Sequence, residues 1–393
     1  MLIRSVSILF LLFVTLFFAT QSTAQIMISA NGVIESKSGG FKFPDGSTQD
    51  SAAPGNAVVF TDQARTLMIP GEFASLEEAF AALQKERISP TVKVTLQLAA
   101  GLYSYSSPLG LAHPDGISIE IMGDTVTPSN VILDFTDCSG LLFSGTYLSL
   151  LDGVEIRGNR TGLPLGAVGI QANAGATVNL GNNVIVDGFD IGIQAQFGGV
   201  VMAEQTTSSN NTLDGYNAFS NGVIYAAGTS ASGNGGSGYA AAEGGTINAR
   251  NTTSEDNNQN GYLAVNGGII NADGALATSN AANGFHAHVN GTIFAPASSS
   301  NGNSADGYVS SANSAIQANG ASATGNGGSG FTSYNSSGIS ALNGSSVDNA
   351  VFGFQVAGHS SIEAISAGAS GNTIADYNLE PNNLSADGSI VLQ

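Results

Sequence analysis

The stretch from Gly238 to Asn260 reads GYAAAEGGTINARNTTSEDNNQN, and the next 23 residues, Gly261 to Asn283, read GYLAVNGGIINADGALATSNAAN. Both begin with a Gly-Tyr pair and carry isoleucine, alanine and asparagine at the same offsets. The pattern extends in both directions over nine units between residues 169 and 375. Each unit begins with a glycine, which is followed by a large apolar or aromatic residue: Ile170, Ile193, Tyr216, Tyr239, Tyr262, Phe285, Tyr308, Phe331 and Phe354.

Further columns repeat with the same period. If the glycine is position 1, position 10 is always β-branched, and position 12 is leucine once and then alanine in every unit. An amide that recurs at a fixed offset can stack on its copy in the next unit, donating to one neighbour and accepting from the other. We therefore expect a structural ladder of asparagines at position 20: Asn211, Asn234, Asn257, Asn280, Asn303, Asn326, Asn349 and Asn372.

The length and internal pattern of the repeat indicate a fold. A fixed period of this size is typical of a solenoid, in which each unit buries its apolar face only against its neighbours. Apolar positions 2 and 4, then 10 and 12, alternate with polar ones as in short strands, and turn-forming residues fill positions 19 to 23. No unit has the three-and-four spacing of a helical solenoid. We predict an all-β, single-stranded parallel β-helix with coils about 4.8 Å apart.

Composition excludes several functions. The chain has 393 residues, a formal net charge of −19, ten Lys and Arg together and a single cysteine, Cys138. No Lys or Arg follows Arg250, so the last 143 residues cannot neutralise phosphate or uronate groups. We expect no nucleic-acid partner and no polyanionic one. Cys138 has no partner for an intrachain disulfide, and it fits a small buried apolar role.

The first 24 residues resemble a secretory signal peptide. Arg4 precedes an apolar run from Ile8 to Ala19, and the small residues of Ser22 to Ala24 form a cleavage site. The run is too short to span a bilayer comfortably, and nothing later in the chain resembles a membrane span. We expect cleavage after Ala24 and a secreted or cell-surface product.

Residues 25–56 form a separate small segment and linker. The string GGFKFPDGSTQ, from Gly39 to Gln49, resembles the short segment that tail-fibre-like extracellular proteins carry ahead of a fibrous or trimeric region. The resemblance implies a surface or fibre context and raises a homotrimer as one arrangement. An ordinary β-hairpin with a Pro-Asp-Gly turn explains the same residues.

Residues 57–168 are expected to hold an N-terminal cap and irregular coils. Ser75 and Glu78 form a capping box for a short helix, which places Leu76, Ala79, Phe80 and Leu83 on one face. Such a helix can cover the open end of a solenoid, whose apolar interior and unpaired strand edge need protection. Residues 169–375 are the nine regular coils, and 376–393 form a C-terminal coil or cap.

The repeated short coils, the asparagine and aromatic columns and the helix ahead of the first strands together resemble right-handed parallel β-helix proteins of the pectin-lyase-like superfamily. The resemblance covers residues 57 to 393. That superfamily includes lyases, hydrolases, epimerases, tailspikes, adhesins and proteins without known activity, so it implies a fold without deciding a function.

Candidate catalytic groups lie only where the repeat is irregular. Glycosidases use paired carboxylates, and Asp152, Glu155 and Asp187 are our candidates, with Asp134 and Arg157 in the same acidic region. Asp152 and Asp187 each precede glycine, and a coil turn would have the same sequence. Turn formation therefore competes with catalysis as the explanation.

Other candidates point to binding. Four aromatic residues are expected to face outward and could stack on sugar rings: Phe219, Tyr225, Phe294 and Tyr334. They do not form a continuous platform in the sequence. His286 and His288 also face outward, but the flanking units supply no third ligand, so we expect no metal. The threonines at positions 16 and 18 suggest an ice-binding array, which Glu255 and Leu276 interrupt.

The sequence thus leads to two hypotheses. The first is a secreted β-helix protein that binds carbohydrate or a cell-surface glycan without catalysis or a cofactor. The alternative is a polysaccharide lyase, epimerase or glycoside hydrolase. Turnover of a polysaccharide would separate the two hypotheses.

Overall fold

A computed structural model describes residues 59–159, 166–379 and 389–392, and the backbone of four two-residue strands nearer the N-terminus. The chain forms two compact units, residues 1–59 and 60–393. In the first unit, β1 (Met27–Ile28) pairs with β2 (Ile34–Glu35), and β3 (Phe41–Lys42) pairs with β4 (Thr48–Gln49), both antiparallel. The expected signal peptide and most of the tail-fibre-like segment lie outside the described residues.

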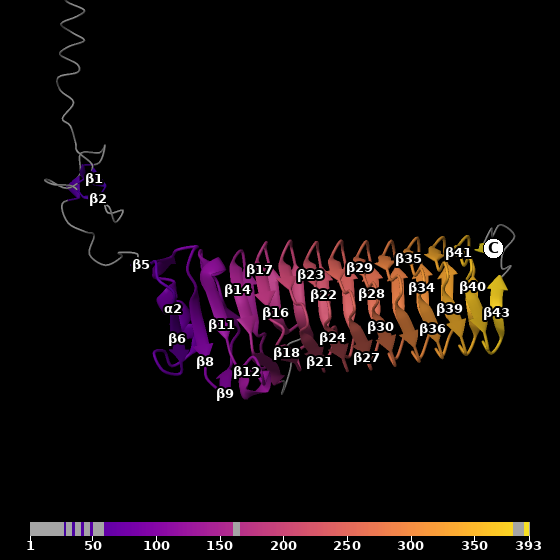
Figure 1. Cartoon of the computed structure of the whole chain (residues 1–393), viewed down its shortest axis with the longest axis horizontal. Helices are drawn as coiled ribbons and strands as arrows, with labels where there is room; N and C mark the ends of the chain where they lie inside the picture. The colour runs from indigo at the N-terminus through magenta and orange to yellow at the C-terminus, as the bar shows by residue number, and fades with distance from the viewer. Residues whose placement is uncertain are drawn as a thin grey trace, which may run out of the picture. The chain divides into compact units, whose positions relative to one another are not determined.

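The second unit is a parallel β-helix, as the repeat predicts (Figure 1). Each coil contributes one strand to each of three sheets. Sheet 1 holds positions 2–5 of the repeat and has 12 strands in the described chain: β10 (Leu109–Gly110), β13 (Leu141–Ser144), β16 (Val168–Asn173), β19 (Ile191–Gln196), β22 (Tyr216–Phe219), β25 (Tyr239–Ala242), β28 (Tyr262–Val265), β31 (Phe285–His288), β34 (Tyr308–Ser311), β37 (Phe331–Tyr334), β40 (Phe352–Val356) and β43 (Ala375–Leu379).

Sheet 2 holds positions 9–11 and has 14 strands within the same described residues: β6 (Arg65–Ile69), β8 (Val94–Leu98), β11 (Ile119–Met122), β14 (Tyr147–Asp152), β17 (Thr177–Leu180), β20 (Val200–Met202), β23 (Val223–Tyr225), β26 (Thr246–Asn248), β29 (Ile269–Asn271), β32 (Thr292–Phe294), β35 (Ala315–Gln317), β38 (Gly338–Ser340), β41 (Ser361–Glu363) and β44 (Ser389–Val391).

Sheet 3 holds positions 16–18 and has 12 strands in the part of the chain that the structure describes: β9 (Gly101–Tyr105), β12 (Val131–Thr136), β15 (Val154–Asn159), β18 (Val184–Asp187), β21 (Thr207–Ser209), β24 (Ser230–Ser232), β27 (Thr253–Glu255), β30 (Leu276–Thr278), β33 (Ser299–Asn301), β36 (Ser322–Thr324), β39 (Ser345–Val347) and β42 (Gly368–Ser370). Outside the three sheets, β5 (Val59–Thr61) pairs with β7 (Glu86–Ile88).

The N-terminal end of the β-helix is covered by the helix that the capping box predicts. Helix α2 spans Leu76–Leu83, and the Ser75 hydroxyl accepts a hydrogen bond from the Glu78 amide. The four residues of its expected apolar face are all buried. Two 3₁₀ turns follow within the irregular coils, η1 (Gly116–Ser118) and η2 (Pro128–Asn130).

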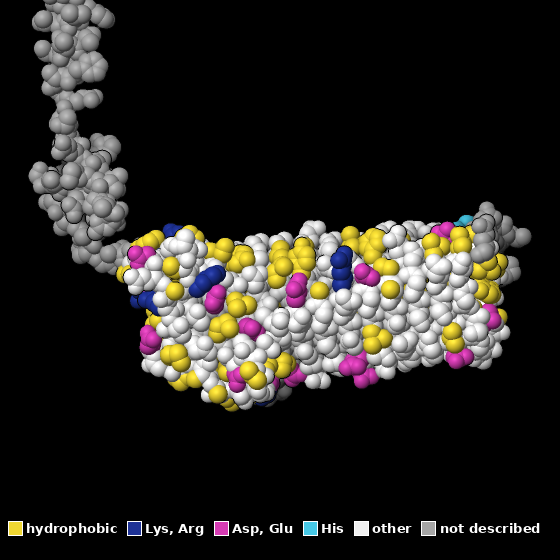
Figure 2. Space-filling model, in the orientation of Figure 1, with side chains coloured by type: hydrophobic (Ala, Val, Ile, Leu, Met, Phe, Trp, Pro, Cys, Tyr) yellow, Lys and Arg dark blue, Asp and Glu magenta, His cyan; other side chains and the backbone are white. Residues whose placement is uncertain are grey.

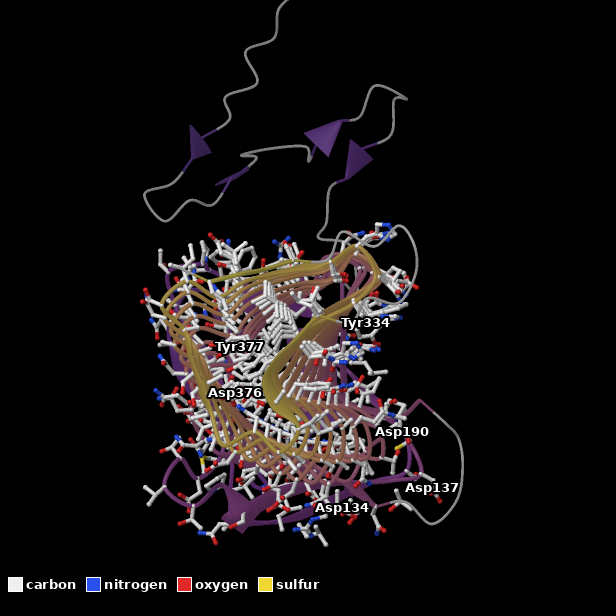
Figure 3. The ribbon with its side chains drawn as sticks, turned by 90° about the vertical axis from the view of Figure 1, so that its right-hand side faces the viewer. Asp134, Asp137, Asp190, Tyr334, Asp376 and Tyr377 are labelled. Atoms are coloured by element: carbon white, nitrogen blue, oxygen red, sulfur yellow. The ribbon has the colours of Figure 1, made fainter. Side chains whose placement is uncertain are left out.

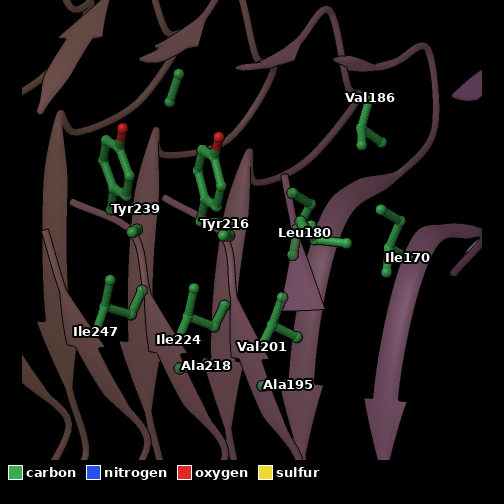
Figure 4. Packing of buried hydrophobic residues seen from close by; sticks show 14 of the residues in the cluster. Ile170, Leu180, Val186, Ala195, Val201, Tyr216, Ala218, Ile224, Tyr239 and Ile247 are labelled. Carbon is green, nitrogen blue, oxygen red and sulfur yellow. The ribbon is translucent and has the colours of Figure 1, made fainter. Parts of the chain in front are cut away.

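Aromatic rings and aliphatic side chains form continuous columns inside the coils. From Tyr216 to Phe354, successive rings of sheet 1 stack with centroids 4.6–5.0 Å apart and planes within 7° of parallel. Figure 4 shows Ile224 and Ile247 of sheet 2 aligned beside Tyr216 and Tyr239. Because every coil repeats the same apolar positions, one core runs along the solenoid.

From Tyr216 to Phe354 in the aromatic column of sheet 1, tyrosine occurs where the residue ten positions earlier has a hydroxyl, and phenylalanine occurs where it does not. Tyr262 meets the Thr252 hydroxyl at 2.8 Å, and Tyr308 meets the Ser298 hydroxyl at 2.9 Å. Phe285 is preceded at that offset by Ala275, and Phe331 by Ala321. A buried phenol needs a hydrogen-bond partner, so the sequence places tyrosine where a hydroxyl is available.

The asparagines at position 20 form an unbroken ladder from Asn211 to Asn372. Each side-chain Nδ2 donates to Oδ1 of the asparagine in the next coil at 2.8–3.0 Å. The same Oδ1 also accepts the backbone N–H of the preceding asparagine. At the C-terminal end, Asn372 Nδ2 donates to Asp376 at 2.9 Å, which gives the last amide an acceptor.

Position 17, beside this ladder, alternates strictly between serine and alanine from Ser208 to Ala369. The hydroxyls of Ser208, Ser254, Ser300 and Ser346 each donate to a glycine carbonyl of the next coil. Each also accepts a hydrogen bond from the ladder asparagine of its own coil, at 2.9–3.1 Å. Ladder amides of both kinds of coil also donate to a backbone carbonyl of the preceding coil, as Asn280 does at 3.1 Å in an alanine coil and Asn303 at 3.2 Å in a serine coil.

Candidate functional site

Charged side chains cluster on the outer face of sheet 3 in its early coils, while Glu255 of β27 stands there without a charged neighbour in register. Successive side chains of a strand point to opposite faces. In β15, Val154 and Ile156 therefore enter the core while Glu155 and Arg157 point outward. Arg157 pairs in register with Asp134 of β12 on one side and Asp187 of β18 on the other. We name Asp134, Glu155, Arg157 and Asp187 the carboxylate cluster.

Glu155 and Arg157 form the centre of this cluster. The Arg157 Nε donates to Glu155 Oε1 at 2.9 Å, and the Nη2 group makes a second, shorter contact to the same oxygen. Glu155 is only 8% exposed although it points out of the sheet, because η2 packs against β15. A carboxylate held out of water needs a charged partner, and Arg157 supplies it.

The two aspartates flank this ion pair. Asp187 Oδ1 accepts hydrogen bonds from the Ser209 hydroxyl at 3.0 Å and from Asn210 Nδ2 at 2.7 Å. Asp134 is 9% exposed, and Figure 3 shows it on the side of the cross-section that sheet 3 forms. In the later coils of sheet 3 the corresponding positions hold mainly Ser and Thr, so the cluster is confined to three neighbouring strands.

Of the three carboxylates that the sequence suggests, the structure places two on this face. Asp152 ends β14 of sheet 2, and its Oδ1 accepts from the backbone N–H of Gly153 at 2.8 Å and of Asn183 at 3.0 Å. That is the bonding of a turn-capping aspartate, and it turns Asp152 away from the outer face of sheet 3. Asp134 and Arg157, which the sequence placed in the same acidic region without assigning them a role, join these two on the face. Arg157 follows Asp134 by one repeat length, a spacing that could have identified the pair.

The four candidate aromatic residues form two pairs, each within one column. Tyr225 and Phe294 lie three strands apart on the outer face of sheet 2, with Asn248 and Asn271 between them in register. Both rings are 38% exposed. Both rings stand at position 11 of their repeats, and two coils with asparagine at that position separate them.

The other pair, Phe219 and Tyr334, lies at position 5 on the outer side of sheet 1, five strands apart. Figure 3 shows Tyr334 on this side, where the ribbon of the sheet curves toward the interior. The curvature leaves outward-facing residues such as Val309 and Thr332 largely buried. Sheet 1 therefore presents a concave outer face.

The histidine pair lies on the same concave face. His288 Nδ1 is 2.8 Å and His286 Nε2 3.3 Å from the Ser311 hydroxyl. Burial, together with the neighbouring His288, lowers the pKa of His286 to about 4. Burial also raises the pKa of Asp214 and Asp306 in the turns that lead into sheet 1. No group of three or more His, Cys, Asp or Glu side chains able to hold a metal occurs in the described residues.

Charge is distributed unevenly along the β-helix. On the face in Figure 2, most of the Lys and Arg side chains lie over the N-terminal coils. Four ion pairs are found in the described ranges: Arg65–Glu86, Arg87–Asp115, Lys93–Glu120 and Arg157–Glu155. All involve residues before 160. No helix in the described part of the chain is long and apolar enough to cross a membrane.

No protein-family model and no curated protein matches the chain. Several solved structures, in contrast, match the chain in fold. The mannuronan C-5 epimerase AlgE6 A-module of Azotobacter vinelandii matches with a TM-score of 0.50 and 16% identity, over 81% of this chain and 93% of that one. A glycoside hydrolase family 87 α-1,3-glucanase catalytic domain in complex with tetrasaccharides matches with a TM-score of 0.54 and 13% identity, over 86% and 69%.

The Agl-KA catalytic domain matches with a TM-score of 0.52 and 14% identity, over 92% of this chain and 70% of that one. At these identities, the likeness shows the fold. The chain is a right-handed parallel β-helix, similar in architecture to enzymes whose names describe action on polysaccharides.

Proposed function

We propose that this chain is a carbohydrate-active β-helix enzyme that hydrolyses a neutral polysaccharide at the carboxylate cluster on sheet 3. The observation that carries the proposal is the presence of three carboxylates around one guanidinium on adjacent strands. The equivalent surface of the later coils is built mainly from uncharged side chains. The rest of this β-helix is stabilised by ladders of uncharged side chains. A cluster of outward-facing charged side chains is therefore better explained by function than by stability.

The spacing of the cluster suits glycoside hydrolysis. Glu155 and Asp187 lie on neighbouring strands and two residues apart along them. Strands about 4.8 Å apart with a rise of about 3.3 Å per residue separate their Cα atoms by about 8 Å. Inverting glycosidases hold their two carboxyl groups about 6.5–9.5 Å apart, which leaves room for the attacking water. In this arrangement one carboxyl protonates the leaving oxygen while the other takes a proton from that water.

The contacts suggest a role for each residue. Glu155 is the carboxylate that contacts the Arg157 guanidinium, and we assign it as the base that activates water. Asp187 is the remaining member of the pair and would donate the proton. Arg157 and Asp134 act as positioning residues, since the guanidinium contacts Glu155 and Asp134 lies beside it in register.

Net charge favours a neutral substrate. With a formal charge of −19 and no Lys or Arg after residue 250, the surface would repel a uronate polymer. Among polysaccharide reactions, this argues for hydrolysis of a neutral glycan over lyase or epimerase action on an acidic one. The resemblance in fold to an α-1,3-glucanase is compatible with that choice and supports it only at the level of architecture.

The test is turnover of neutral polysaccharides by the purified protein, followed as new reducing ends. We expect Glu155→Gln and Asp187→Asn each to lower the rate by about 100-fold or more, the usual effect of removing a general acid or base. Asp152→Asn is the matched control, because an amide oxygen can still cap the turn, and its rate should stay near that of the parent. Equal losses in all three variants would contradict the assignment.

Glycan binding without catalysis is the second candidate, and the exposed pair Tyr225 and Phe294 favours it. Aromatic faces stack on sugar rings, and the amides of Asn248 and Asn271 between them can bond hydroxyls. Under this alternative, insoluble glycans would retain the protein on pull-down without release of reducing ends. Retention would then fall when Tyr225 and Phe294 are both replaced by alanine.

We further propose that the chain is secreted after cleavage behind Ala24. N-terminal sequencing of the protein recovered outside the producing cells would test this. A homotrimer formed through residues 26–53 is proposed on the tail-fibre-like string. The solution mass of the mature chain should fall to one third when that segment is removed, and an unchanged mass would contradict the trimer.

A further inference from the structure

Two rows of outward-facing side chains cross the early strands of sheet 3, from β9 through β12 and β15 to β18. One row contains Asp134, Arg157 and Asp187 of the carboxylate cluster, in register. In the other row, Glu155 has aliphatic neighbours on both sides. Three residues, which we name the aliphatic row, stand in register with Glu155: Leu102, Ile132 and Ile185. Over these four strands Glu155 is thus a single charged side chain within an apolar row.

The aliphatic character of this row ends after β18. From β21 onward the row continues in register as Thr207, Ser230, Thr253, Leu276, Ser299, Ser322, Ser345 and Gly368. Hydroxyl side chains predominate there, and Leu276 stands alone among them. Outward aliphatic side chains therefore gather on the same strands as the charged ones.

The aliphatic row is accessible to a ligand. Leu102 is 61% exposed, and Ile132 and Ile185 are partly exposed. The 3₁₀ turn η2 packs against β12, β15 and β18 and ends immediately before Val131, the first residue of β12. It therefore borders the row on the side where these strands begin. A single exposed aliphatic residue needs no explanation, but a row of them beside charged groups is typical of a binding surface.

The two rows together match the chemistry of a sugar ring. The C–H faces of the ring are apolar, whereas its hydroxyl groups lie around its edge. Binding sites commonly combine apolar walls with a few polar groups that orient the ligand. Here the aliphatic row supplies the apolar surface. The parallel row, two residues or about 7 Å further along each strand, supplies carboxylates that accept hydrogen bonds and the Arg157 guanidinium, which donates them.

The spacing of the strands sets how many rings the surface accommodates. Neighbouring strands lie about 4.8 Å apart, which is close to the length of one sugar unit in an extended chain. A glycan that crosses the strands along the solenoid axis therefore places about one ring on each coil. The ring over β15 meets Glu155, and its two neighbours lie over Ile132 and Ile185. Leu102 receives a fourth ring over β9.

We propose that the aliphatic row binds four consecutive rings of an extended neutral glycan, with the ring that is attacked over Glu155. The position of the attacked ring rests on the proposed function. The inference adds a preferred chain length and a direction of the chain along the solenoid axis. Beyond β18 the row offers hydroxyl groups in place of aliphatic ones, so further rings should add little to binding.

The test is isothermal titration calorimetry of the mature Glu155→Gln chain with glucose oligomers of two to six rings. The oligomers carry β-1,3, β-1,4, α-1,3 or α-1,4 linkages. For at least one linkage, we expect the affinity to rise about tenfold or more between two and four rings and then to level off. Ile132→Ala and Ile185→Ala, each added to Glu155→Gln, should weaken binding of the four-ring oligomer about tenfold.

Leu276→Ala is the matched control, because Leu276 stands in the same row four strands beyond β18. It should leave binding unchanged. Ile132→Leu and Ile185→Leu keep an aliphatic side chain and should retain the affinity of the parent to within about twofold. An unchanged unfolding midpoint in the alanine variants separates a loss of binding from a loss of structure.

Turnover by the unmodified chain, measured beside binding, separates this inference from the proposed hydrolysis. Turnover without any gain in affinity between two and four rings would overturn the aliphatic row as a binding surface and leave the hydrolysis intact. Equal weakening by Leu276→Ala and Ile185→Ala would overturn it as well. Length-dependent binding that needs Ile132 and Ile185, in a chain without turnover, would support the row and contradict the hydrolysis.

Discussion

The coils before residue 160 and those after residue 190 use the same three sheets but are stabilised in different ways. The early coils contain all four ion pairs of the described chain, a capping helix and two 3₁₀ turns. The later coils rely on stacked rings, an amide ladder and buried hydroxyls. Repeated uncharged contacts therefore stabilise the later coils, whereas the irregular early coils use ion pairs in the described residues.

Removing one ring from the aromatic column tests most directly whether stacked rings stabilise the later coils. Tyr262 is fully buried between Tyr239 and Phe285. Tyr262→Ala should cost about 3–5 kcal/mol, the usual effect of deleting a large buried side chain. The free energy of unfolding from guanidinium denaturation measures it. Tyr225→Ala, at a partly exposed site on sheet 2, should cost far less, and similar losses in both would show that the column contributes nothing special.

A second experiment interrupts the amide ladder. Asn280→Leu leaves Asn257 without its acceptor and Asn303 without its donor. We expect destabilisation of about 1–3 kcal/mol, the cost of buried polar groups left unpaired. Thermal or denaturant unfolding would report the change. The exposed neighbour Asn258 provides the control, because Asn258→Leu removes no ladder bond. An unchanged midpoint in Asn280→Leu would falsify the role given to the ladder.

A third experiment tests the ion pairs of the early coils. The Arg87 guanidinium, which donates to Asp115 at 2.7 and 2.8 Å, lowers the pKa of Asp115 to about 2. A carboxyl whose pKa is lower in the folded state stabilises the fold above its unfolded pKa, near 3.8, and that contribution is lost as pH falls toward 2. Because Arg87 is largely exposed, solvent screening should keep this effect small.

Comparing unfolding midpoints between pH 5 and pH 2 for the parent and Asp115→Asn would measure this contribution. The parent should lose stability relative to the variant over that range. Asp214 and Asp306 in the later coils should behave in the opposite way. Burial raises their pKa, so their protonated forms favour the fold and their contribution declines as pH rises through the raised values. Parallel pH profiles for the parent and Asp115→Asn would contradict the assignment of acid sensitivity to this ion pair.

A fourth experiment concerns the pairing of tyrosine with a hydroxyl. Phe285→Tyr alone introduces a phenol where Ala275 offers no hydroxyl, and it should cost about 1 kcal/mol. Adding Ala275→Ser should recover most of that loss, because the Ser298–Tyr308 pair shows that serine suffices. A double-mutant cycle on unfolding free energies gives the coupling. Strictly additive effects would show that the two positions are independent.

The fold could be predicted from sequence because each regular coil repeats its neighbour. The glycine, aromatic, isoleucine and asparagine columns fix the register, and the pairing of Ile247 with Ile270 follows from the period alone. The parallel β-helix and its capping helix were correctly expected. The concave outer face of sheet 1 was not, because the curvature of a sheet leaves no periodic trace in the sequence.

The candidate sites were harder to predict, since they lie where the period fails. Leu96 pairs with Ile121, Ile121 with Leu151, and Leu151 with Leu180, so successive early coils differ in length. Without a fixed period, the sequence could not place Asp152 in a turn of sheet 2 while Glu155 faced outward from sheet 3.

The alternation of serine and alanine at position 17 bears on how such a chain could lengthen. Inserting or deleting a single coil places two serines or two alanines in adjacent coils and so ends the alternation. Inserting or deleting two coils preserves the order. Tandem duplication of this gene segment would therefore preserve the alternation only in steps of two repeats.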